Sequence, residues 1–469
     1  MILFLGETVM KIKKLEIRGL YGTYDYNVSF NDDLTFVYGE NGCGKTTILD
    51  IVSSIVTGEL YNLFHYKFDE IILSYHRNRY AKIHRIRIKA HDNRYDLSLD
   101  DNEKHETIVN VSKISELDSV GGDNYIVKRR FMLGNKFPRF LRETFNYIYL
   151  PLGRNCENID NIDPHYRQHR IKAPRDKDTV NKNYLNESLR YVEEIIRKGC
   201  MNVNWEENKI NQRFKSDIFT SSLEVTNEYS VDKLLKSISN KETLDSIEQN
   251  LDEYQKMLQT IGEWNEVTKE RVGRFAEKYK AAFKAAQNKD SKGHHNLSIE
   301  LLIMSMEFDR IKKIAAQAQE IEEEKEKARS PITSFVSTVN KFLSMGVGCK
   351  KITINNFGEI SIETDFLDRK LTLYDLSSGE KQIIIIFACL VFGLSAGQSG
   401  IYIIDEPEAS LHLAWQKIFV ESIRDVNPSI QLIFATHAPE IIGRYSDYAV
   451  KLRRKVNLEY EEKTKIYDK

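Results

Sequence analysis

Apolar positions near both ends of the chain predict strands and helices in alternation. Residues 11–18 (KIKKLEIR) alternate between polar and apolar side chains, as a strand with one buried face does. Residues 34–38 (LTFVY) lead into a glycine-rich loop, and residues 46–57 then repeat apolar positions at helical spacing. Near the other end, two strand-like apolar runs flank a helix-like stretch, at 401–404, 431–435 and 411–425. This alternation predicts an α/β fold with a parallel sheet.

The middle of the chain has a different pattern. No proline occurs between 175 and 330, and apolar residues recur every three or four positions in 185–196, 244–258 and 311–321. We interpret this region as an antiparallel helical arm inserted into the α/β domain, with its tip near 289–296. A helical subdomain packed on that domain is the alternative. The predicted division is an N-terminal half at 1–178, a helical insertion at 179–346 and a C-terminal half at 347–469, whose charged last segment, 451–469, reads as a tail or partner contact.

Composition restricts the possible partners. The 469 residues carry a formal net charge of -1, so a surface that binds nucleic acid must be a local patch. The cysteines are widely spaced and form no CxxC pair, which excludes a disulfide framework and a zinc ribbon and predicts a reducing compartment. The longest apolar run, 383–394, is shorter than the ~18 residues that a membrane span needs. We therefore expect a cytoplasmic protein with no membrane partner.

Residues 39–46 (GENGCGKT) match the phosphate-binding pattern GxxxxGK[ST] between a strand and a helix. Glycines let backbone N–H groups surround phosphate oxygens, Lys45 reaches the β- and γ-phosphates, and the Thr46 hydroxyl can ligate Mg²⁺. The sequence therefore predicts ATP and Mg²⁺ as cofactors. The residues expected to contact the nucleotide here are Gly39, Asn41, Gly42, Gly44, Lys45, Thr46 and Thr47.

Two further motifs follow apolar strands. The run 401–404 ends in Asp405, which is predicted to bind Mg²⁺ with Thr46, and in Glu406, which is positioned to polarise the attacking water. Glu408 is the next candidate for that role. His437 follows the strand at 431–435 and resembles the switch histidine of ABC-type ATPases, a resemblance that implies a second catalytic residue.

Residues 376–382 (LSSGEKQ) precede an apolar helix and resemble the signature motif of ABC ATPases. With GENGCGKTT, IDEPEASLH and ATHAPEII, they make the chain similar to ABC-type ATPases of the SMC/RecF/OLD branch, and most similar to small anti-phage defence ATPases such as PtuA of Septu and AriA of PARIS. The resemblance covers 11–60 and 370–450 firmly and 147–155 weakly. It implies an α/β ABC-ATPase head, in which a P-loop sheet joins an antiparallel β subdomain, with an inserted α-helical, coiled-coil-like arm.

The resemblance also implies how such heads work. Ser377, Gly379 and Glu380 of the signature would contact ATP bound to a second head, so a homodimer or a larger multimer of dimers is expected. The sequence departs from the family pattern in three places. Ser378 replaces a signature glycine, the usual aspartate after the 405–406 acids is missing, and no glutamine of the Q-loop is recognisable, with 153–155 the candidate for its place.

Two functions remain open. The chain can be the ATPase sensor and scaffold of a bacterial anti-phage defence complex that controls a separate nuclease, or a DNA-repair ATPase that clamps DNA; a metabolic ATPase is a third class. The histidine pairs His165/His169 and His294/His295 lack the pattern of a nuclease unit, so we expect ATP hydrolysis without intrinsic nuclease activity. Three basic residues alternate with Ile86 and Ile88 along one predicted strand and are possible contacts to nucleic acid: Arg85, Arg87 and Lys89. The alternative is that this face of the sheet is simply solvated.

Overall fold

The computed structural model divides the chain into two compact units. One comprises residues 1–200 and 331–469, and the other residues 201–330. The predicted domain boundaries after 178 and 346 stay predictions. The structure describes residues 10–76, 82–91, 94–100, 104–109, 135–150, 177–223, 244–260, 264–287, 299–346, 349–365, 369–393 and 400–456.

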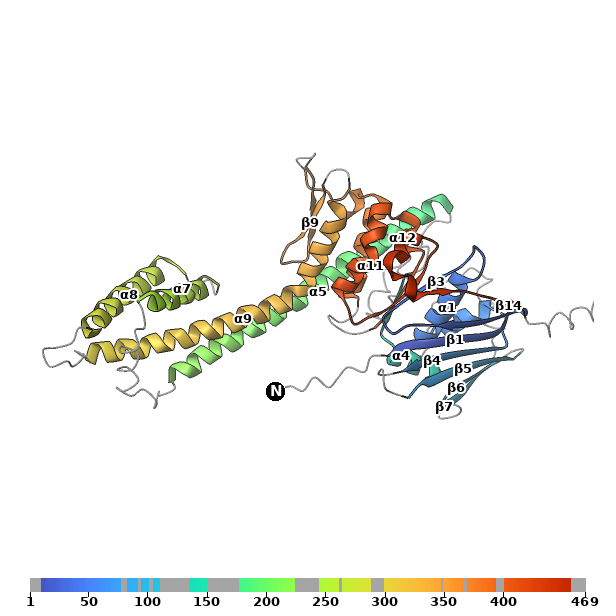
Figure 1. The fold of residues 1–469 in the computed structure, drawn as a ribbon, viewed down its shortest axis with the longest axis horizontal. Helices are drawn as coiled ribbons and strands as arrows, with labels where there is room; N and C mark the ends of the chain where they lie inside the picture. The colour runs from blue at the N-terminus through green and yellow to red at the C-terminus, as the bar shows by residue number, and fades with distance from the viewer. Residues whose placement is uncertain are drawn as a thin grey trace, which may run out of the picture. The chain divides into compact units, whose positions relative to one another are not determined.

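The first unit contains a five-stranded parallel sheet, whose strand β3 is labelled in Figure 1. Its strand order is β13-β3-β12-β11-β8, and every neighbouring pair is parallel. Most of its side chains are buried because both of its faces are covered. The strands are β3 (Leu34–Tyr38), β8 (Tyr147–Leu150), β11 (Ile401–Asp405), β12 (Gln431–Ala435) and β13 (Ala449–Lys451).

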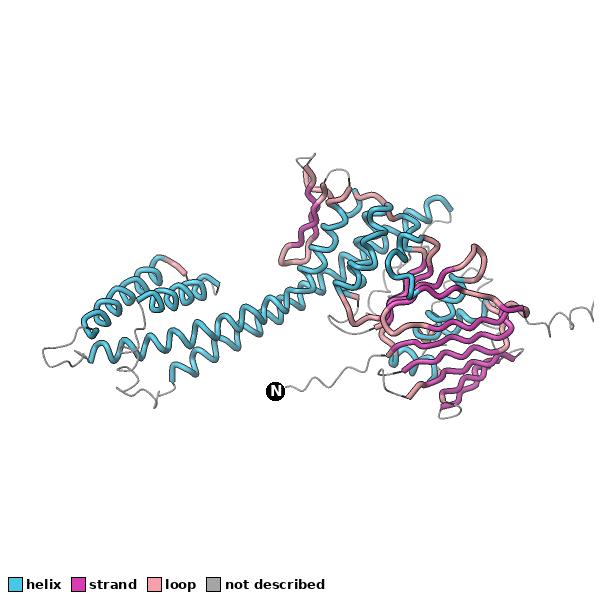
Figure 2. The backbone as a smooth tube through the Cα atoms, viewed as in Figure 1, coloured by secondary structure: helices cyan, strands magenta, loops and turns pink. Residues whose placement is uncertain are grey.

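A second, antiparallel sheet has the order β14-β2-β1-β4-β5-β6-β7 and appears as the broad set of magenta strands in Figure 2. The apolar positions predicted for the first strand, such as Ile12, Leu15 and Ile17, are buried. The strands are β1 (Lys11–Leu20), β2 (Tyr24–Ser29), β4 (Glu70–His76), β5 (His84–His91), β6 (Arg94–Leu99), β7 (Lys104–Val109) and β14 (Lys455–Val456).

Helix α1 (Lys45–Val56) packs in the core that the two sheets share. Ile48, Ile51 and Ile55 lie there with Ile17 of β1 and Ile403 of β11. At one point the sheets are joined directly, through the fully buried side chain of Gln431. Its amide nitrogen donates to the carbonyls of Ile12 and Asn31 at 2.7 Å each, and its oxygen accepts from the Ile12 N–H at 2.8 Å.

The opposite face of the parallel sheet is covered by helices. Phe36 and Phe434 stack on this face with ring centroids 5.3 Å apart, and Phe387 and Phe419 pack above them from two of the helices. Nearly all of the apolar run at 383–394 is buried, so it is a core helix. The α-helices of this unit include α4 (Lys136–Thr144), α10 (Ser378–Phe392), α11 (Leu413–Val426) and α12 (Pro439–Ile442).

Shorter elements complete the first unit. They are the strands β9 (Lys351–Ile354) and β10 (Ile360–Glu363), which form a hairpin, and the 3-10 helices η1 (Leu60–His65), η4 (Leu373–Asp375), η5 (Pro407–Ser410) and η6 (Gly443–Tyr448).

The charged segment from residue 451 onward does not begin as a free tail. Lys451 closes β13 beside β3, and Lys455 and Val456 pair with β2. This pairing was not predicted, because it depends on the edges of strands formed by distant residues and not on the apolar content of the segment itself. Residues 457–469 lie outside the described part of the chain.

The predicted helical insertion is present, but it holds more than one antiparallel pair. Ion pairs Glu207–Arg329 and Arg213–Glu324 show that α5 and α9 run in opposite directions. Two further helices pack on α9 through apolar clusters around Phe283, and the expected tip at 289–296 lies outside the described residues. The helices are α5 (Lys177–Leu223), α7 (Leu244–Thr260), α8 (Glu266–Gln287) and α9 (Ile299–Leu343), of which the 201–330 parts form the second unit.

The combination of a P-loop sheet, an antiparallel β subdomain and a helical insertion confirms the predicted fold class. No helix among the described residues is long and apolar enough to span a membrane.

Candidate active site

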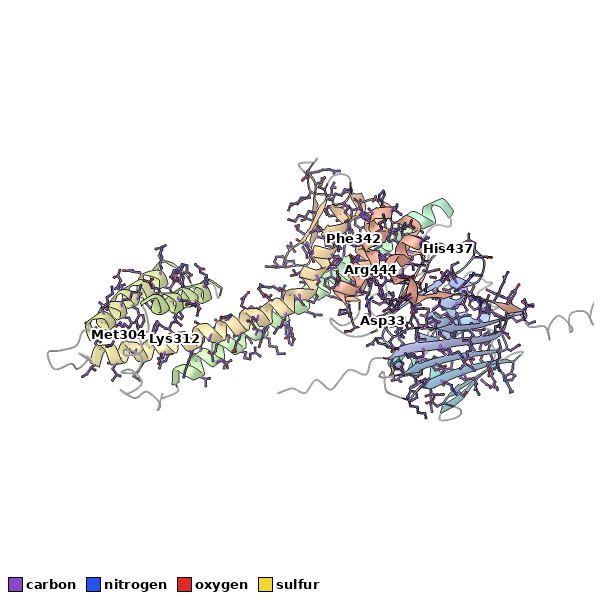
Figure 3. The ribbon with its side chains drawn as sticks, in the orientation of Figure 1. Asp33, Met304, Lys312, Phe342, His437 and Arg444 are labelled. Carbon is purple, nitrogen blue, oxygen red and sulfur yellow. The ribbon has the colours of Figure 1, made fainter. Side chains whose placement is uncertain are left out.

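Three predicted motifs meet at the carboxyl edge of the parallel sheet. The phosphate-binding loop follows β3, the two acids end β11, and His437 follows β12; Figure 3 labels that histidine. These strands are neighbours, and Ala435 of β12 lies in register with Val37 on one side and Asp405 on the other. Motifs that are far apart in sequence therefore lie together at one edge of the sheet, where ligands bind in open α/β folds.

The phosphate-binding loop has the backbone that glycine permits. Gly42 and Gly44 have φ of 77° and 99°, and a Cβ at Gly44 would lie 2.9 Å from the Tyr26 hydroxyl. That hydroxyl donates to the carbonyl of Cys43 at 3.0 Å, so β2 supports the loop. The Lys45 ammonium group is folded over the loop and donates to the carbonyls of Gly39 and Glu40 at 3.1 and 3.2 Å.

The remaining residues of the loop are accessible to a ligand. Asn41 and Thr46 are exposed, and Thr47 lies half-buried with its hydroxyl 3.4 Å from that of Tyr21.

The predicted magnesium ligands contact each other. The Thr46 hydroxyl donates to one oxygen of Asp405 at 2.8 Å, and the other Asp405 oxygen is buried with no hydrogen-bond partner in the described part of the chain. Burial raises the pKa of Asp405 to about 6, and the charges of Glu406 and Asp50 add to the increase, while the Thr46 hydrogen bond and Lys45 oppose it.

These residues fit Mg²⁺. A buried carboxylate oxygen without a partner, beside a hydroxyl, suits a hard cation that binds one or two protein groups and completes its shell with phosphate and water oxygens. No cluster of three or more His, Cys, Asp or Glu residues suited to a metal occurs in the described ranges, and the Mg²⁺ mode of binding does not require one.

The two predicted catalytic residues lie side by side. Glu406 has a left-handed backbone with φ of 45°, and its carboxylate is 3.8 Å from Nε2 of His437. One oxygen of Glu408 accepts the backbone N–H of His437 at 2.7 Å. Sequence analysis identified Glu408 only as a substitute base, because a contact across 29 residues cannot be read from spacing.

One further acidic residue near the site, Asp50, was not predicted. Asp50, on α1, accepts hydrogen bonds from the hydroxyls of Tyr149 and Tyr66, the latter at 3.3 Å. Burial raises the pKa of Asp50, and the two hydroxyls partly offset that effect. The available signal was its position four residues after Thr46, which places both residues on one face of the helix.

The signature residues form the start of α10. Ser377 caps the helix, and Ser377 and Ser378 are exposed whereas Gly379 is buried. The sequence groups Glu380 with the nucleotide contacts, which stays a prediction, and within one chain its side chain is engaged at the start of the helix. Its buried carboxylate accepts the Ser377 N–H at 2.8 Å and pairs with Lys350 at 2.8 Å, so both oxygens are engaged inside the protein. This is a capping box, in which a serine and a glutamate three residues later satisfy the first N–H groups of the helix.

The basic ladder is present but not purely basic. Arg85 and Lys89 are exposed and Arg87 is partly exposed, while Ile86 and Ile88 are buried. Figure 1 shows β4 beside β5. Glu70 of β4 lies 3.5 Å from Arg87 and 3.9 Å from Lys89, and so lowers the positive charge of this face. Nucleic-acid binding here stays a prediction. The candidate Q-loop segment 153–155 and both histidine pairs lie outside the described residues.

Known proteins resemble parts of this chain or all of it. A probable ATPase of retron Vc95 from Vibrio cholerae serotype O1 biovar El Tor is 26% identical over 140 residues. The match covers 28% of this chain and only 25% of that protein.

Two solved Smc head domains align with almost the whole chain. The head with an extended coiled coil bound to the C-terminal domain of ScpA, from Pyrococcus furiosus, is 13% identical with a TM-score of 0.40, and 98% of this chain and 100% of that chain are covered. The head with a coiled coil and joint, from Pyrococcus yayanosii, is 15% identical with a TM-score of 0.36 and the same coverage. These TM-scores are too low to carry an argument, so the fold rests on the strand order described above.

The family of AAA ATPase domains matches residues 10–442. This range includes the phosphate-binding loop, the signature, the two acids and His437. The chain belongs to the family of AAA ATPase domains.

Proposed function

We propose that the chain binds ATP with Mg²⁺ at the phosphate-binding loop and hydrolyses it. The observation that carries this proposal is the Thr46–Asp405 hydrogen bond, which leaves one buried Asp405 oxygen unpartnered beside the Glu406–His437 pair. When bound, Mg²⁺ neutralises charge on the phosphates. Lys45 supplies a second positive charge, and Glu406 accepts the proton of the attacking water. Glu408 holds His437 at the same edge.

Two chains are proposed to act together. Ser377 is exposed at the N-terminus of α10, a helix of 15 residues whose terminus carries partial positive charge. This end of the helix suits contact with the γ-phosphate bound to a second copy of the chain. ATP would then hold two heads together, and its hydrolysis would release them.

The proposed role is that of an ATPase subunit in an anti-phage defence complex, with cleavage carried out by a separate nuclease. Similarity to a retron ATPase supports this reading. A DNA clamp is the second candidate, favoured by the exposed Arg85 and Lys89 on β5, but Glu70 offsets part of their charge.

Two variants test the chemistry. Lys45→Ala should abolish ATP binding because it removes the charge that faces the phosphates. Glu406→Gln should keep binding and stop turnover, since only water activation is lost. Glu421→Gln is the matched control, because Glu421 pairs with Arg444 at 3.0 Å outside the site. Unchanged ATP affinity in Lys45→Ala would disprove the assignment of the loop.

Mixed dimers test the shared site. Ser377→Arg alone should bind ATP and fail to hydrolyse it. Mixed with Lys45→Ala chains, each heterodimer pairs one intact loop with one intact signature, and some hydrolysis should return. Heterodimers that are demonstrably formed and stay inactive would contradict the composite site.

The division of labour has its own test. The purified chain, given Mg²⁺ or Mn²⁺, should hydrolyse ATP and cut neither DNA nor RNA. Cleavage that survives purification and is lost on a substitution outside the ATP site would place a nuclease in this chain.

A further inference from the structure

Asp50 is a half-buried carboxylate to which the proposed hydrolysis gives no role. Tyr149 of β8 donates its hydroxyl to one oxygen of Asp50, and Tyr66 of η1 donates to the other at 3.3 Å. A carboxylate only accepts hydrogen bonds, so both hydroxyls serve as donors. Tyr149 is almost completely buried, and its hydroxyl is therefore committed to Asp50.

The position of Asp50 relates it to the metal-binding pair. Residues four apart lie on the same face of a helix, so Asp50 lies one turn along α1 from Thr46. Tyr149 lies in register with Ile403 on β11, two residues before Asp405. The negative charge of Asp50 is one of the influences that raise the pKa of Asp405, so the two carboxylates interact through the protein.

The Asp50 carboxylate is stabilised by hydrogen bonds from two tyrosine hydroxyls but not by a positively charged side chain. The influences on its pKa are burial, which raises it, and the hydroxyls of Tyr149 and Tyr66, which lower it. No lysine or arginine of the described ranges forms an ion pair with it. Lys45 offsets part of the charge of Asp405 but is not among the influences on the pKa of Asp50. Two nearby carboxylates repel each other, and a divalent cation bound between the protein and phosphate relieves that repulsion.

We propose that Asp50 is a positioning residue for Mg²⁺. The negative charge of Asp50, held by Tyr149 and Tyr66 one helical turn from Thr46, strengthens binding of the cation together with ATP. Asp50 acts through the field at the ligands and does not touch the metal. This inference rests on the proposed function, because it concerns the cation of the same site.

The test measures the affinity for ATP by calorimetry, first in EDTA and then at increasing Mg²⁺. In Asp50→Asn, ATP without metal should bind more tightly than in the native chain, because a negative charge facing the phosphates is gone. The gain in ATP affinity that Mg²⁺ provides should fall roughly tenfold, the order of effect expected when one nearby charge is removed in a medium of intermediate polarity. A merely structural defect would weaken binding under both conditions.

Matched variants separate charge from packing. Asp50→Glu keeps the charge and should keep most of the gain from Mg²⁺. Tyr149→Phe should lower that gain, whereas Tyr402→Phe should not, although it also removes a buried hydroxyl, one that donates to the Ile386 carbonyl at 2.6 Å. If Asp50→Asn does not fold, the inference is tested by comparing the gain in ATP affinity from Mg²⁺ in Tyr149→Phe with the gain in Tyr402→Phe.

Three results are distinguishable. A native chain that binds no ATP contradicts the proposed function itself. A native chain that binds ATP with Mg²⁺, together with an Asp50→Asn chain that shows the same gain, overturns only the inference about Asp50. Equal gains in Tyr149→Phe and Tyr402→Phe overturn it as well.

Discussion

Replacing Gln431 by leucine should destabilise the first unit strongly. The leucine fills a similar volume but cannot form the three hydrogen bonds that the amide makes with Ile12 and Asn31. The Gln431 side chain is completely buried, so water has little access to the groups that it leaves, and the partly buried Asn31 carbonyl is the least shielded of the three. Each buried backbone group that loses its partner costs about 1–3 kcal/mol. Three such groups at the low end of that range predict a loss of about 3 kcal/mol in the free energy of unfolding.

Urea denaturation followed by circular dichroism measures this loss. Gln416→Leu serves as the control, because it removes one hydrogen bond, to the Leu411 carbonyl at 2.9 Å, at a partly buried position of the same unit. The control should lose about 1 kcal/mol. A Gln431→Leu protein that is no less stable than the control would refute the reasoning that this amide joins the two sheets.

Three further outcomes follow from the contacts described. Glu408→Ala frees the His437 N–H and should lower kcat roughly ten- to a hundredfold with KM for ATP unchanged; a changed KM alone would contradict this. Burial raises the pKa of Asp100, but hydrogen bonds from His84 and the backbone outweigh it and hold the pKa below its usual value. The stability that Asp100 provides should therefore be present above pH ~4 and be lost below it, and Asp100→Asn should lower Tm at pH 7 but not in strong acid. If the β5 face binds duplex DNA, changing Arg85, Arg87 and Lys89 together to glutamate should weaken the salt dependence of binding. The slope of log affinity against log salt concentration should fall by about 0.9 per lost contact, and an unchanged slope would mean that the face is a solvated surface.

Local patterns were sufficient to predict the centre of the fold. The apolar runs at 34–38, 401–404 and 431–435 are strands of the parallel sheet, and the helix after the phosphate-binding loop begins at Lys45. Such strands are covered on both faces, so their burial is visible as a continuous apolar run.

Contacts between distant residues were not predictable in the same way. The apolar stripes in the middle of the chain showed which faces of the helices are buried, but not that α7 and α8 pack on α9. Tyr149 and Asp50 are 99 residues apart and meet only because β8 lies beside β11. The spacing of the signature motif did not reveal that the Glu380 carboxylate pairs with Lys350, which is 30 residues away.

The position of β3 between β12 and β13 has a consequence for biosynthesis. Both neighbours of the strand that carries the phosphate-binding loop come from beyond residue 430, and Gln431 is 419 residues from its hydrogen-bond partner Ile12. Translation proceeds from the N-terminus, so β3 leaves the ribosome long before either neighbour exists. The loop can take its final form only after residues 431–451 have left the ribosome, so we expect products that terminate before this segment to lack an ordered phosphate-binding loop.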